Sequence, residues 1–551
     1  MRFNEWLKSG TPWVWLNAGG VSVSIIMVVG LLLLIATRGL VHFWPGDIIQ
    51  AQLISADNTR MIAGERVEVE RVSAEQIRAA GIETEPGREF YERYLLKVGN
   101  RDLTGSDFAW VLKRDLKNEQ HPQDIMAVER REWGNLYGYL VAVKENGTVV
   151  ISGTQGWPEL QSRINRALKI YRKIYAIEKG DIGSINHRME RLRLKQRRFE
   201  LKGAVSQGDQ VQLDATRTEL DAEYAQLETQ LAELYALFTR DSFITRTADG
   251  QEVEVNISKV VRAYRPNAMG SIDKAIFYIA KLWEFVADDP REANTEGGIF
   301  PAIYGTVLMV LLMSIFVTPF GVIAAVYLRE YARQGIVTRT IRIAVNNLAG
   351  VPSIVYGVFG LGFFVYFLGG ELDKLFFPEA LPAPTFGTSG LLWASLTLAL
   401  LTVPIVIVAT EEGLARIPRS VREGSLALGA TKFETLWRVV LPMSSPAIMT
   451  GLILAVARAA GEVAPLMLVG VVKLAPSLPL DQNYPYLHLD QKFMHLGFHI
   501  YDVGFQSPNV EAARPLVYAT ALLLVLVIAV LNFTAVAIRN HLREKYKALE
   551  A

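Results

Sequence analysis

The stretch "REGSLALGATKFETLWRVVLP", residues 422–442, decides how the rest of this chain is interpreted. It lies in a loop, 411–446, between two apolar segments that are each long enough to cross a bilayer. Residues 420–428 can form a short helix, and Gly429 supplies the permissive backbone at which such a helix ends. A second helix from Thr431 would lead back to the membrane. We therefore expect an exposed helix–turn–helix element that another subunit can grip.

Six apolar stretches have the length of about 20 residues that a membrane-spanning helix requires. The first is followed by no small-x-small cleavage site, so we expect an uncleaved anchor rather than a signal peptide. The six predicted spans are 18–36, 302–328, 344–368, 390–410, 447–472 and 515–538.

Composition narrows the function classes further. The chain has 57 basic and 56 acidic residues, so a nucleic-acid-binding polycation is excluded. It contains no cysteine, which excludes disulfides, thiol catalysis and cysteine-ligated metals. Half of its residues are hydrophobic and 21% are charged, a mixture typical of membrane spans joined to a polar domain.

Basic residues orient the spans, because short cytoplasmic loops are rich in Lys and Arg. The loop after the second span, the 411–446 loop and the tail at 541–551 are all basic, whereas the 369–389 loop contains one basic residue, Lys374. Six spans with these segments inside place the N-terminal residues 1–17 and the tail in the cytoplasm. The same parity places 37–296 outside, which is the periplasm of an inner membrane.

The predicted outer domain, 37–296, begins with β segments and continues with two helical arms over about 158–239. The turn "KGAVSQGD" between the arms predicts an antiparallel hairpin. Residues 188–202 hold seven basic side chains and residues 214–233 hold six acidic ones, so the folded arms would face opposite charge. Such charge runs indicate either a solvated surface or a docking surface for a partner.

The opening stretch resembles the signature loop of bacterial ABC importer permeases. In that family, Glu-Ala-Ala is followed after three residues by Gly and after nine more by Ile-x-Leu-Pro; here Gly424 and Ser425 replace the alanines, and Val439 replaces Ile. The chain contains no P-loop, so ATP hydrolysis would belong to a partner subunit. The resemblance implies that the loop docks into the ATPase. The residues that it assigns to this coupling are Arg422, Glu423, Ala427, Gly429, Ala430, Leu441 and Pro442.

Three further stretches resemble the phosphate importer permeases of the PstA type. They are "GGIFPAIYGT" (297–306), "LAGVPSIVYGVFG" (348–360) and "ARAAGEVAPLMLVG" (457–470). With the signature loop, the likeness covers 297–540, and the outer domain is similar in layout to the extra N-terminal domain of the long members. The resemblance implies four partners: a homologous second permease, an ABC ATPase dimer that uses ATP and magnesium, an extracytoplasmic phosphate-binding protein and membrane lipid.

Arg458 and Glu462 stand out as charged residues inside the predicted fifth span. Charges at such positions usually face a bundle interior or a substrate pathway. Four residues apart, they share one helix face and can pair, and the planar fork of Arg suits an oxyanion. Two interpretations remain: a substrate pathway, or a packing salt bridge that never meets substrate.

Proline and histidine positions give two further expectations. Pro319 in the second span and Pro352 in the third weaken helix hydrogen bonding, so each is either a hinge or a static kink. Between the last two spans, His488, Asp490, His495 and His499 have the residue types of metal ligands. Their aromatic surroundings favour a loop packed at the membrane surface or a docking face, and we expect neither a metal nor another cofactor on this chain.

Together these features predict a mainly α membrane protein. Six transmembrane helices would form an ABC importer permease core, 297–540, and an α+β extracytoplasmic domain would carry the antiparallel hairpin. The expected function is that of a transport subunit without its own ATPase site, in a phosphate importer. The alternatives are a permease for sulfate or molybdate, and a membrane-anchored sensor or scaffold.

Overall fold

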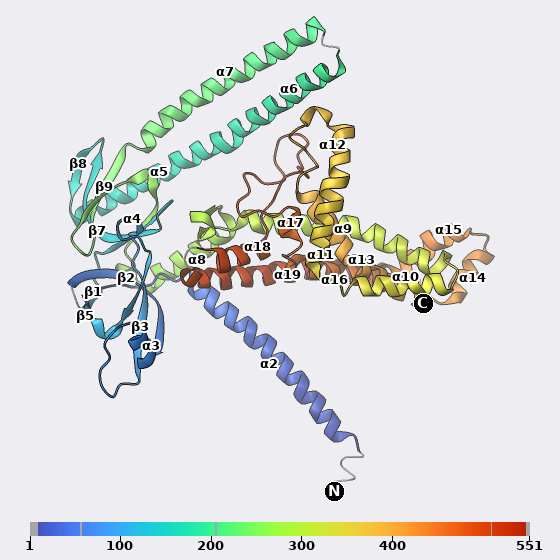
Figure 1. Ribbon diagram of the computed structural model, residues 1–551, viewed down its shortest axis with the longest axis horizontal. Helices are drawn as coiled ribbons and strands as arrows, with labels where there is room; N and C mark the ends of the chain where they lie inside the picture. The colour runs from blue at the N-terminus through green and yellow to red at the C-terminus, as the bar shows by residue number, and fades with distance from the viewer. Residues whose placement is uncertain (1–8, 56–57, 204–205, 508–509, 547–551) are drawn as a thin grey trace. The chain divides into compact units, whose positions relative to one another are not determined.

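The computed structural model describes residues 9–55, 58–203, 206–507 and 510–546, and Figure 1 traces them from blue to red. The chain divides into two compact units. The helical unit contains residues 1–42 and 299–551, and the inserted unit contains residues 43–298. The expected fold class is confirmed: the chain is mainly helical with a β-rich region near its N-terminus.

The helical unit contains six helices long and apolar enough to cross a membrane, within the described residues. Their windows are Trp13–Val41, Phe300–Tyr331, Ser353–Phe376, Leu391–Arg416, Lys432–Gly461 and Ala513–Glu544. The helices that form them are α2 (Thr11–Val41), α9 (Phe300–Val326), α11 and α12 (Ser353–Phe359 and Gly370–Phe376), α13 (Leu391–Arg416), α16 (Leu441–Gly461) and α19 (Val510–Tyr546). A π-helical segment, Gly360–Gly369, joins α11 to α12.

Two predicted spans have wrong boundaries. The third was expected over 344–368, but a separate amphipathic helix, α10 (Ile336–Leu348), ends there, and the spanning helix begins at Ser353 after Pro352. The fifth was expected over 447–472, but α16 ends at Gly461. Glu462 takes an extended backbone directly after the helix, and Pro465, three residues later, cannot donate a hydrogen bond that would continue it.

Helix α13 forms the centre of the helical unit. Its side chains pack between α9 and α16, and the residues at this core include Met313, Leu398, Val406 and Ala459. Glycines allow the close approach: a Cβ added to Gly321 would lie 2.6 Å from the Val406 side chain. Small residues at helix contacts are typical of membrane bundles, where backbones approach closely.

The inserted unit is built on two antiparallel sheets. The first has the order β4-β3-β2-β1-β5, and the second has β10-β9-β7-β6-β11 with β8 beside β7. The strands of the first sheet are β1 (Ile48–Ser55), β2 (Asn58–Ser73), β3 (Phe90–Lys97), β4 (Phe108–Leu112) and β5 (Leu116–Gln120). Those of the second are β6 (Met126–Arg130), β7 (Asn135–Glu145), β8 (Thr148–Ser152), β9 (Asp241–Arg246), β10 (Glu252–Asn256) and β11 (Val260–Tyr264).

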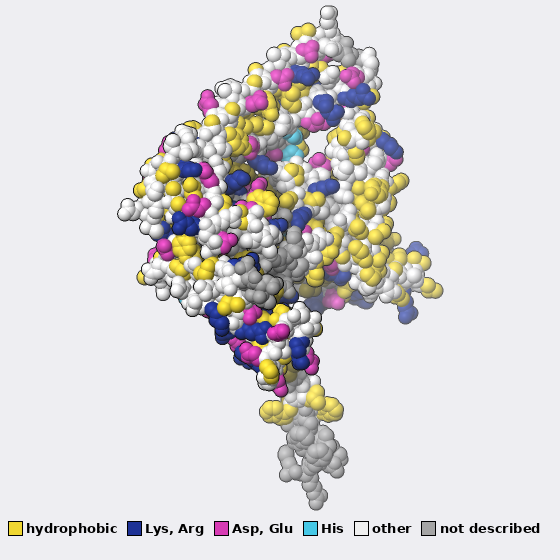
Figure 2. Space-filling view, turned by 60° about the vertical axis from the view of Figure 1, so that its left-hand side comes forward, with side chains coloured by type: hydrophobic (Ala, Val, Ile, Leu, Met, Phe, Trp, Pro, Cys, Tyr) yellow, Lys and Arg dark blue, Asp and Glu magenta, His cyan; other side chains and the backbone are white. Residues whose placement is uncertain are grey.

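The predicted hairpin is present in the inserted unit, and Figure 1 shows its two long arms side by side. One arm is α5 (Trp157–Tyr175) and α6 (Ile182–Lys202), joined by a π-helical segment; the other is α7 (Gln207–Phe238). Arg188 bridges the arms, with its Nη2 2.7 Å from Glu223 Oε1. Other ion pairs lie within one arm, and Figure 2 shows acidic and basic side chains interspersed along the hairpin at the top. The base of α5 packs on the second sheet through Leu160 and Ile164.

The inserted unit ends with an amphipathic helix, α8 (Ser271–Ala287), and a two-stranded ribbon, β12 (Pro290–Arg291) with β13 (Glu296–Gly297). Two short helices, α3 (Ala74–Ala79) and α4 (Arg101–Thr104), lie in connections of the first sheet. The ribbon of β12 and β13 is followed directly by α9, the second spanning helix.

Candidate functional site

The loop between the fourth and fifth spans folds as the predicted helix, glycine turn and second helix. The first helix, α14 (Arg419–Ala427), begins directly after Pro418. It ends at Gly429, whose φ of 87° lies in the left-handed region that favours glycine. The amide of Ala430 donates to the Ser425 carbonyl at 3.3 Å, which closes the helix end. The turn thus depends on Gly429.

The second helix, α15 (Lys432–Thr435), begins with a capping box. The Thr431 hydroxyl accepts a hydrogen bond from the Glu434 amide, and the Glu434 carboxylate accepts one from the Thr431 amide. A π-helical segment, Leu436–Val440, then leads into α16, in which Leu441 and Pro442 are the first residues. The helical path from Lys432 to Gly461 therefore joins this loop to the fifth span directly.

Arg422 fixes α14 to the base of the bundle. Its guanidinium donates to the carbonyls of Ile417 at 2.7 Å and Leu414 at 2.8 Å, and to Glu330 Oε1 at 2.9 Å. Lys432 contacts the same segment, because its Nζ donates to the Glu330 carbonyl at 2.5 Å. Since Glu330 ends the second span, these bonds tie the loop to two spans. Part of the predicted coupling set is therefore an internal brace.

The other side of this loop is apolar and exposed. Glu423 and Ala427 are exposed on α14, and Leu428 at its end is 91% exposed. The rings of Phe433 and Trp437 are also exposed and stack with a centroid distance of 6.3 Å. We call the exposed side chains Leu426, Leu428, Phe433 and Trp437 the loop face. Exposed apolar and aromatic groups beside a braced helix are typical of a protein-docking surface.

Arg458 and Glu462 pair as expected but lie elsewhere in the helix than expected. Arg458 Nε is 3.5 Å from Glu462 Oε1. Arg458 is in the last turn of α16, and Glu462 is its C-cap residue with extended backbone, φ −80° and ψ 132°. The expectation that both residues lie inside the span is wrong, because the helix ends between them. Arg458 lies 17 residues beyond Leu441, about 26 Å at 1.5 Å per residue.

The chain after Glu462 turns tightly against the third span. A Cβ added to Gly357 of α11 would lie 2.6 Å from Pro465 Cα. The neighbouring Tyr356 is buried, and its hydroxyl donates to the Leu348 carbonyl at 2.6 Å. The short helix α17 (Leu466–Val469) follows and packs into the core through Leu466. Glu462 is therefore held on a structured turn rather than on a mobile loop end.

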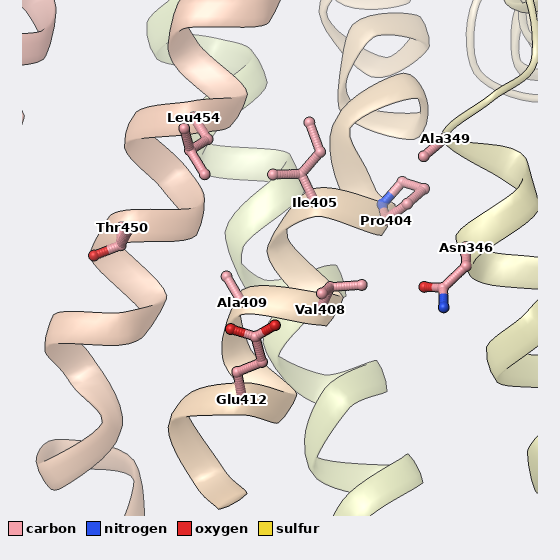
Figure 3. Close-up of a pocket in the computed structure, with 9 residues that line it drawn as sticks. All are labelled: Asn346, Ala349, Pro404, Ile405, Val408, Ala409, Glu412, Thr450 and Leu454. Atoms are coloured by element: carbon pink, nitrogen blue, oxygen red, sulfur yellow. The ribbon is translucent and has the colours of Figure 1, made fainter. Parts of the chain in front are cut away.

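A pocket of about 470 Å³ opens between α10, α13 and α16. In Figure 3, Glu412 and Val408 of α13 lie across from Asn346 of α10, and Leu454 and Thr450 come from α16. The walls are mainly apolar, with Asn346 and Glu412 as polar groups. Arg458 is not among its lining residues. Sequence reasoning missed Asn346 and Glu412, although both are polar residues beside spans.

The two candidate hinge prolines differ in placement. Pro319 lies inside α9, where it removes one helix hydrogen bond. Pro352 is the N-cap of α11 with φ −54° and ψ 134°, so its predicted position inside a span is wrong. Three further prolines, Pro404 in α13, Pro446 in α16 and Pro515 in α19, lie inside spanning helices.

Two of the histidines between the last two spans, His488 and His495, make local contacts. His488 Nε2 lies 2.9 Å from Asp481 Oδ1, and His495 Nδ1 accepts a hydrogen bond from the Gly497 amide. Burial lowers the pKa of His495 to about 3 and that of His499 to about 4. No group of three metal-ligating side chains occurs in the described part of the chain, so these residues and Asp490 are not brought together as one ligand set.

Comparison with known proteins matches the helical unit. Residues 317–547 match the family described as "Binding-protein-dependent transport system inner membrane component". "Phosphate transport system permease protein PstA 1" of Mycobacterium tuberculosis is 34% identical over 244 residues, which cover 44% of this chain and 71% of that protein. "Phosphate transport system permease protein PstA" of Mycobacterium leprae is 34% identical over 267 residues, which cover 48% of this chain and 78% of that protein.

Proposed function

Because the chain belongs to the family of phosphate transport system permease proteins of the PstA type, we propose that it is a transmembrane subunit of an ATP-driven importer of inorganic phosphate. The observation that carries this proposal is the braced loop between the fourth and fifth spans. Its loop face is exposed, and its second helix continues into α16. A partner that grips α14 would therefore move a spanning helix directly.

In this proposal the chain carries no ATPase site of its own. A dimer of ABC ATPase subunits binds ATP and magnesium and docks on the loop face together with Glu423, Ala427 and Ala430. A homologous second permease completes the bundle and covers part of the exposed apolar side chains on the spanning helices, and membrane lipid covers the rest. An extracytoplasmic binding protein delivers phosphate, and both termini are cytoplasmic with residues 43–298 in the periplasm.

Arg458 is the proposed anion contact on the pathway. The guanidinium offers a planar pair of donors to phosphate oxygens, and Glu462 holds part of its charge at 3.5 Å. Glu412 in the pocket is a poor partner for an anion, because two like charges repel. The pocket between α10, α13 and α16 is therefore proposed as space through which helices move, not as a phosphate site.

The test is transport by the assembled complex in proteoliposomes. The chain is co-expressed with its second permease, its ATPase and its binding protein, and ATP-dependent uptake of phosphate, sulfate and molybdate is measured in parallel. Uptake of phosphate alone supports the proposal. Uptake of sulfate or molybdate instead supports the oxyanion alternative, and a complex that forms but transports none of the three supports a sensor or scaffold.

A variant of the loop face tests the coupling role within the same assay. Ala427 is exposed on α14, so Ala427→Trp leaves the fold of the chain intact while it blocks close docking. We expect loss of ATPase co-purification and of uptake. Gly208→Trp, in an exposed position of α7 in the inserted unit, is the matched control and should keep both. Normal uptake in Ala427→Trp would contradict the assignment of this surface.

A further inference from the structure

Helix α8 is not a spanning helix; one of its faces packs on the inserted unit, and the other is exposed. Its inner face packs on the sheets of the inserted unit: the rings of Phe277 and Tyr264 have a centroid distance of 4.6 Å. The same face is held by ion pairs, with Lys281 Nζ 2.6 Å from Glu129 Oε2 and Arg291 Nη2 2.6 Å from Glu284 Oε1. The helix is therefore firmly placed in its unit.

The outer face of α8 is an uninterrupted apolar stripe. Its members follow at steps of four, three, four and three residues, so they lie along one side of the helix. Ile272 is 77% exposed and Trp283 is 72% exposed. From its first to its last member the stripe is about 21 Å long, at 1.5 Å per residue. The stripe consists of Ile272, Ile276, Ile279, Trp283 and Val286.

Two aromatic residues that follow the first membrane span contact α8. Val41 is the last residue of α2, and Phe43 and Trp44 follow two and three residues later. The ring of Phe43 lies 4.9 Å from that of Phe285, and Trp44 lies 5.8 Å from Tyr278. Consecutive Cα atoms are 3.8 Å apart, so the end of α2 is within about 8 Å of Phe43.

Gly298, just before the second membrane span, lies against the C-terminal end of α8. Gly298 is two residues before Phe300, where α9 begins. The Gly298 amide donates to the Asp289 carbonyl at 3.0 Å, and a Cβ added to Gly298 would lie 2.6 Å from the Glu284 carbonyl oxygen. Phe43 and Gly298, the two ends of the inserted unit, therefore both lie beside residues 284–289 of that unit, and each is joined by one or two residues to a spanning helix.

We propose that α8 lies in the lipid–water interface, with its stripe among the headgroups and upper acyl chains of the outer leaflet. An exposed apolar stripe along one side of a helix that does not span the membrane is typical of an interfacial helix, and exposed Trp side chains are enriched at that depth. The connections to both spans bring the C-terminal end of α8 to this depth, and an apolar stripe along its whole length favours a helix lying flat. The partner is the lipid surface itself, and this assignment is independent of which anion is transported.

The absence of cysteine from the chain allows a sharp test. Single cysteines replace Ile276, Ile279 and Trp283 in the full-length protein, each is labelled with a nitroxide, and the protein is reconstituted in lipid nanodiscs. Electron paramagnetic resonance then measures collision with oxygen, which partitions into lipid, and with a water-soluble nickel chelate. Val150→Cys, on the exposed strand β8, is the aqueous reference, and Ile315→Cys, exposed on the spanning helix α9, is the lipid reference.

The expected result is an oxygen-to-nickel collision ratio severalfold higher at the three stripe positions than at Val150, between the values of the two references. Nickel collision equal to that at Val150 would place the stripe in water and overturn the proposal. Protection from both reagents would mean that protein covers the stripe, which would also overturn it and would identify the stripe as a protein interface.

Discussion

The guanidinium of Arg422 and the carboxylate of Glu330 lie 2.9 Å apart, although the two residues are 92 positions apart in sequence. Both side chains are largely buried, so the pair is not a screened surface contact. It connects the end of the second span with α14, the first helix of the exposed loop. A partner subunit that docks on that loop would therefore act on the second span as well as on the fifth.

Removal of this brace should loosen the loop without unfolding the bundle. Arg422→Ala deletes bonds to Glu330 and to two backbone carbonyls, and hydrogen bonds with charged groups contribute about 1.5–3 kcal/mol each. We expect a lower unfolding temperature and weaker ATPase co-purification. Glu330→Gln keeps an acceptor and should be milder. An Arg422→Ala protein with normal ATPase binding would contradict the bracing role.

The two glycines of the loop should respond to alanine with opposite signs. At Gly429 the φ of 87° makes alanine strained by about 1–2 kcal/mol, although no atom lies within 4 Å of the added Cβ. At Gly424, inside α14 with equally open space, alanine should stabilise the helix by about 0.5–1 kcal/mol. Thermal unfolding of Gly429→Ala and Gly424→Ala measures both. Equal shifts would show that the left-handed turn is not required.

Variants of Arg458 and Glu462 distinguish a role of the pair in the substrate pathway from a role in helix packing. Arg458→Lys keeps the charge but loses the planar fork, so phosphate uptake should fall markedly. In Arg458→Gln, phosphate uptake should fall further, because Glu462 then lacks its partner. In the double variant Arg458→Gln with Glu462→Gln, a packing pair is replaced by neutral groups at little cost. Uptake per assembled complex is the measure, and full recovery in the double variant would show a packing role.

Acid should destabilise the segment around α18 (Leu496–Tyr501) through its buried histidines. Burial lowers the pKa of His499 to about 4 from an unfolded value near 6.5, so the unfolded state binds the proton first. Stability is therefore full above pH 6.5 and falls as pH decreases toward 4. His499→Leu should flatten this dependence of the unfolding temperature, whereas the exposed His541→Leu should not. A pH dependence unchanged in His499→Leu would contradict it.

Reporter fusions test the proposed orientation of the spans. Fusions at Gly208 and Gly387 should report an extracytoplasmic position, and fusions at Gly335 and Lys432 a cytoplasmic one. The physical basis is the bias of Lys and Arg toward cytoplasmic loops. Alkaline phosphatase and green fluorescent protein at each position provide opposite signals. A cytoplasmic signal at Gly208 would overturn the six-span topology.

The sequence predicts local structure best where the deciding interactions lie within a few residues of one another. Gly429 and Thr431 set the turn and the second cap of the loop through local hydrogen bonds, so the element was predicted almost to the residue. The ends of the third and fifth spans were wrong because an apolar run does not record where a helix stops. In the structure the third span begins directly after Pro352, and the fifth ends at Gly461, where Glu462 takes an extended backbone.

Local sequence signals do not predict which distant segments of the chain pack together. Strands β7 and β9 pair although β8 and the whole helical hairpin lie between them in sequence, and β1 pairs with β5 after three other strands have intervened. The pocket of Asn346 and Glu412 likewise draws on three separate helices. For α8, likewise, only the structure shows which of its faces the unit covers.

The ends of the inserted unit meet at adjacent residues of α8, Phe43 at Phe285 and Gly298 at Glu284. A unit with neighbouring ends can be added to a chain between two segments without separating them, much as a domain is grafted into a surface loop. The first and second spans would then keep the spacing of a short connection despite 256 intervening residues. A permease that joins its first two spans by a brief turn and one that carries this large outer unit can thus share the same membrane architecture.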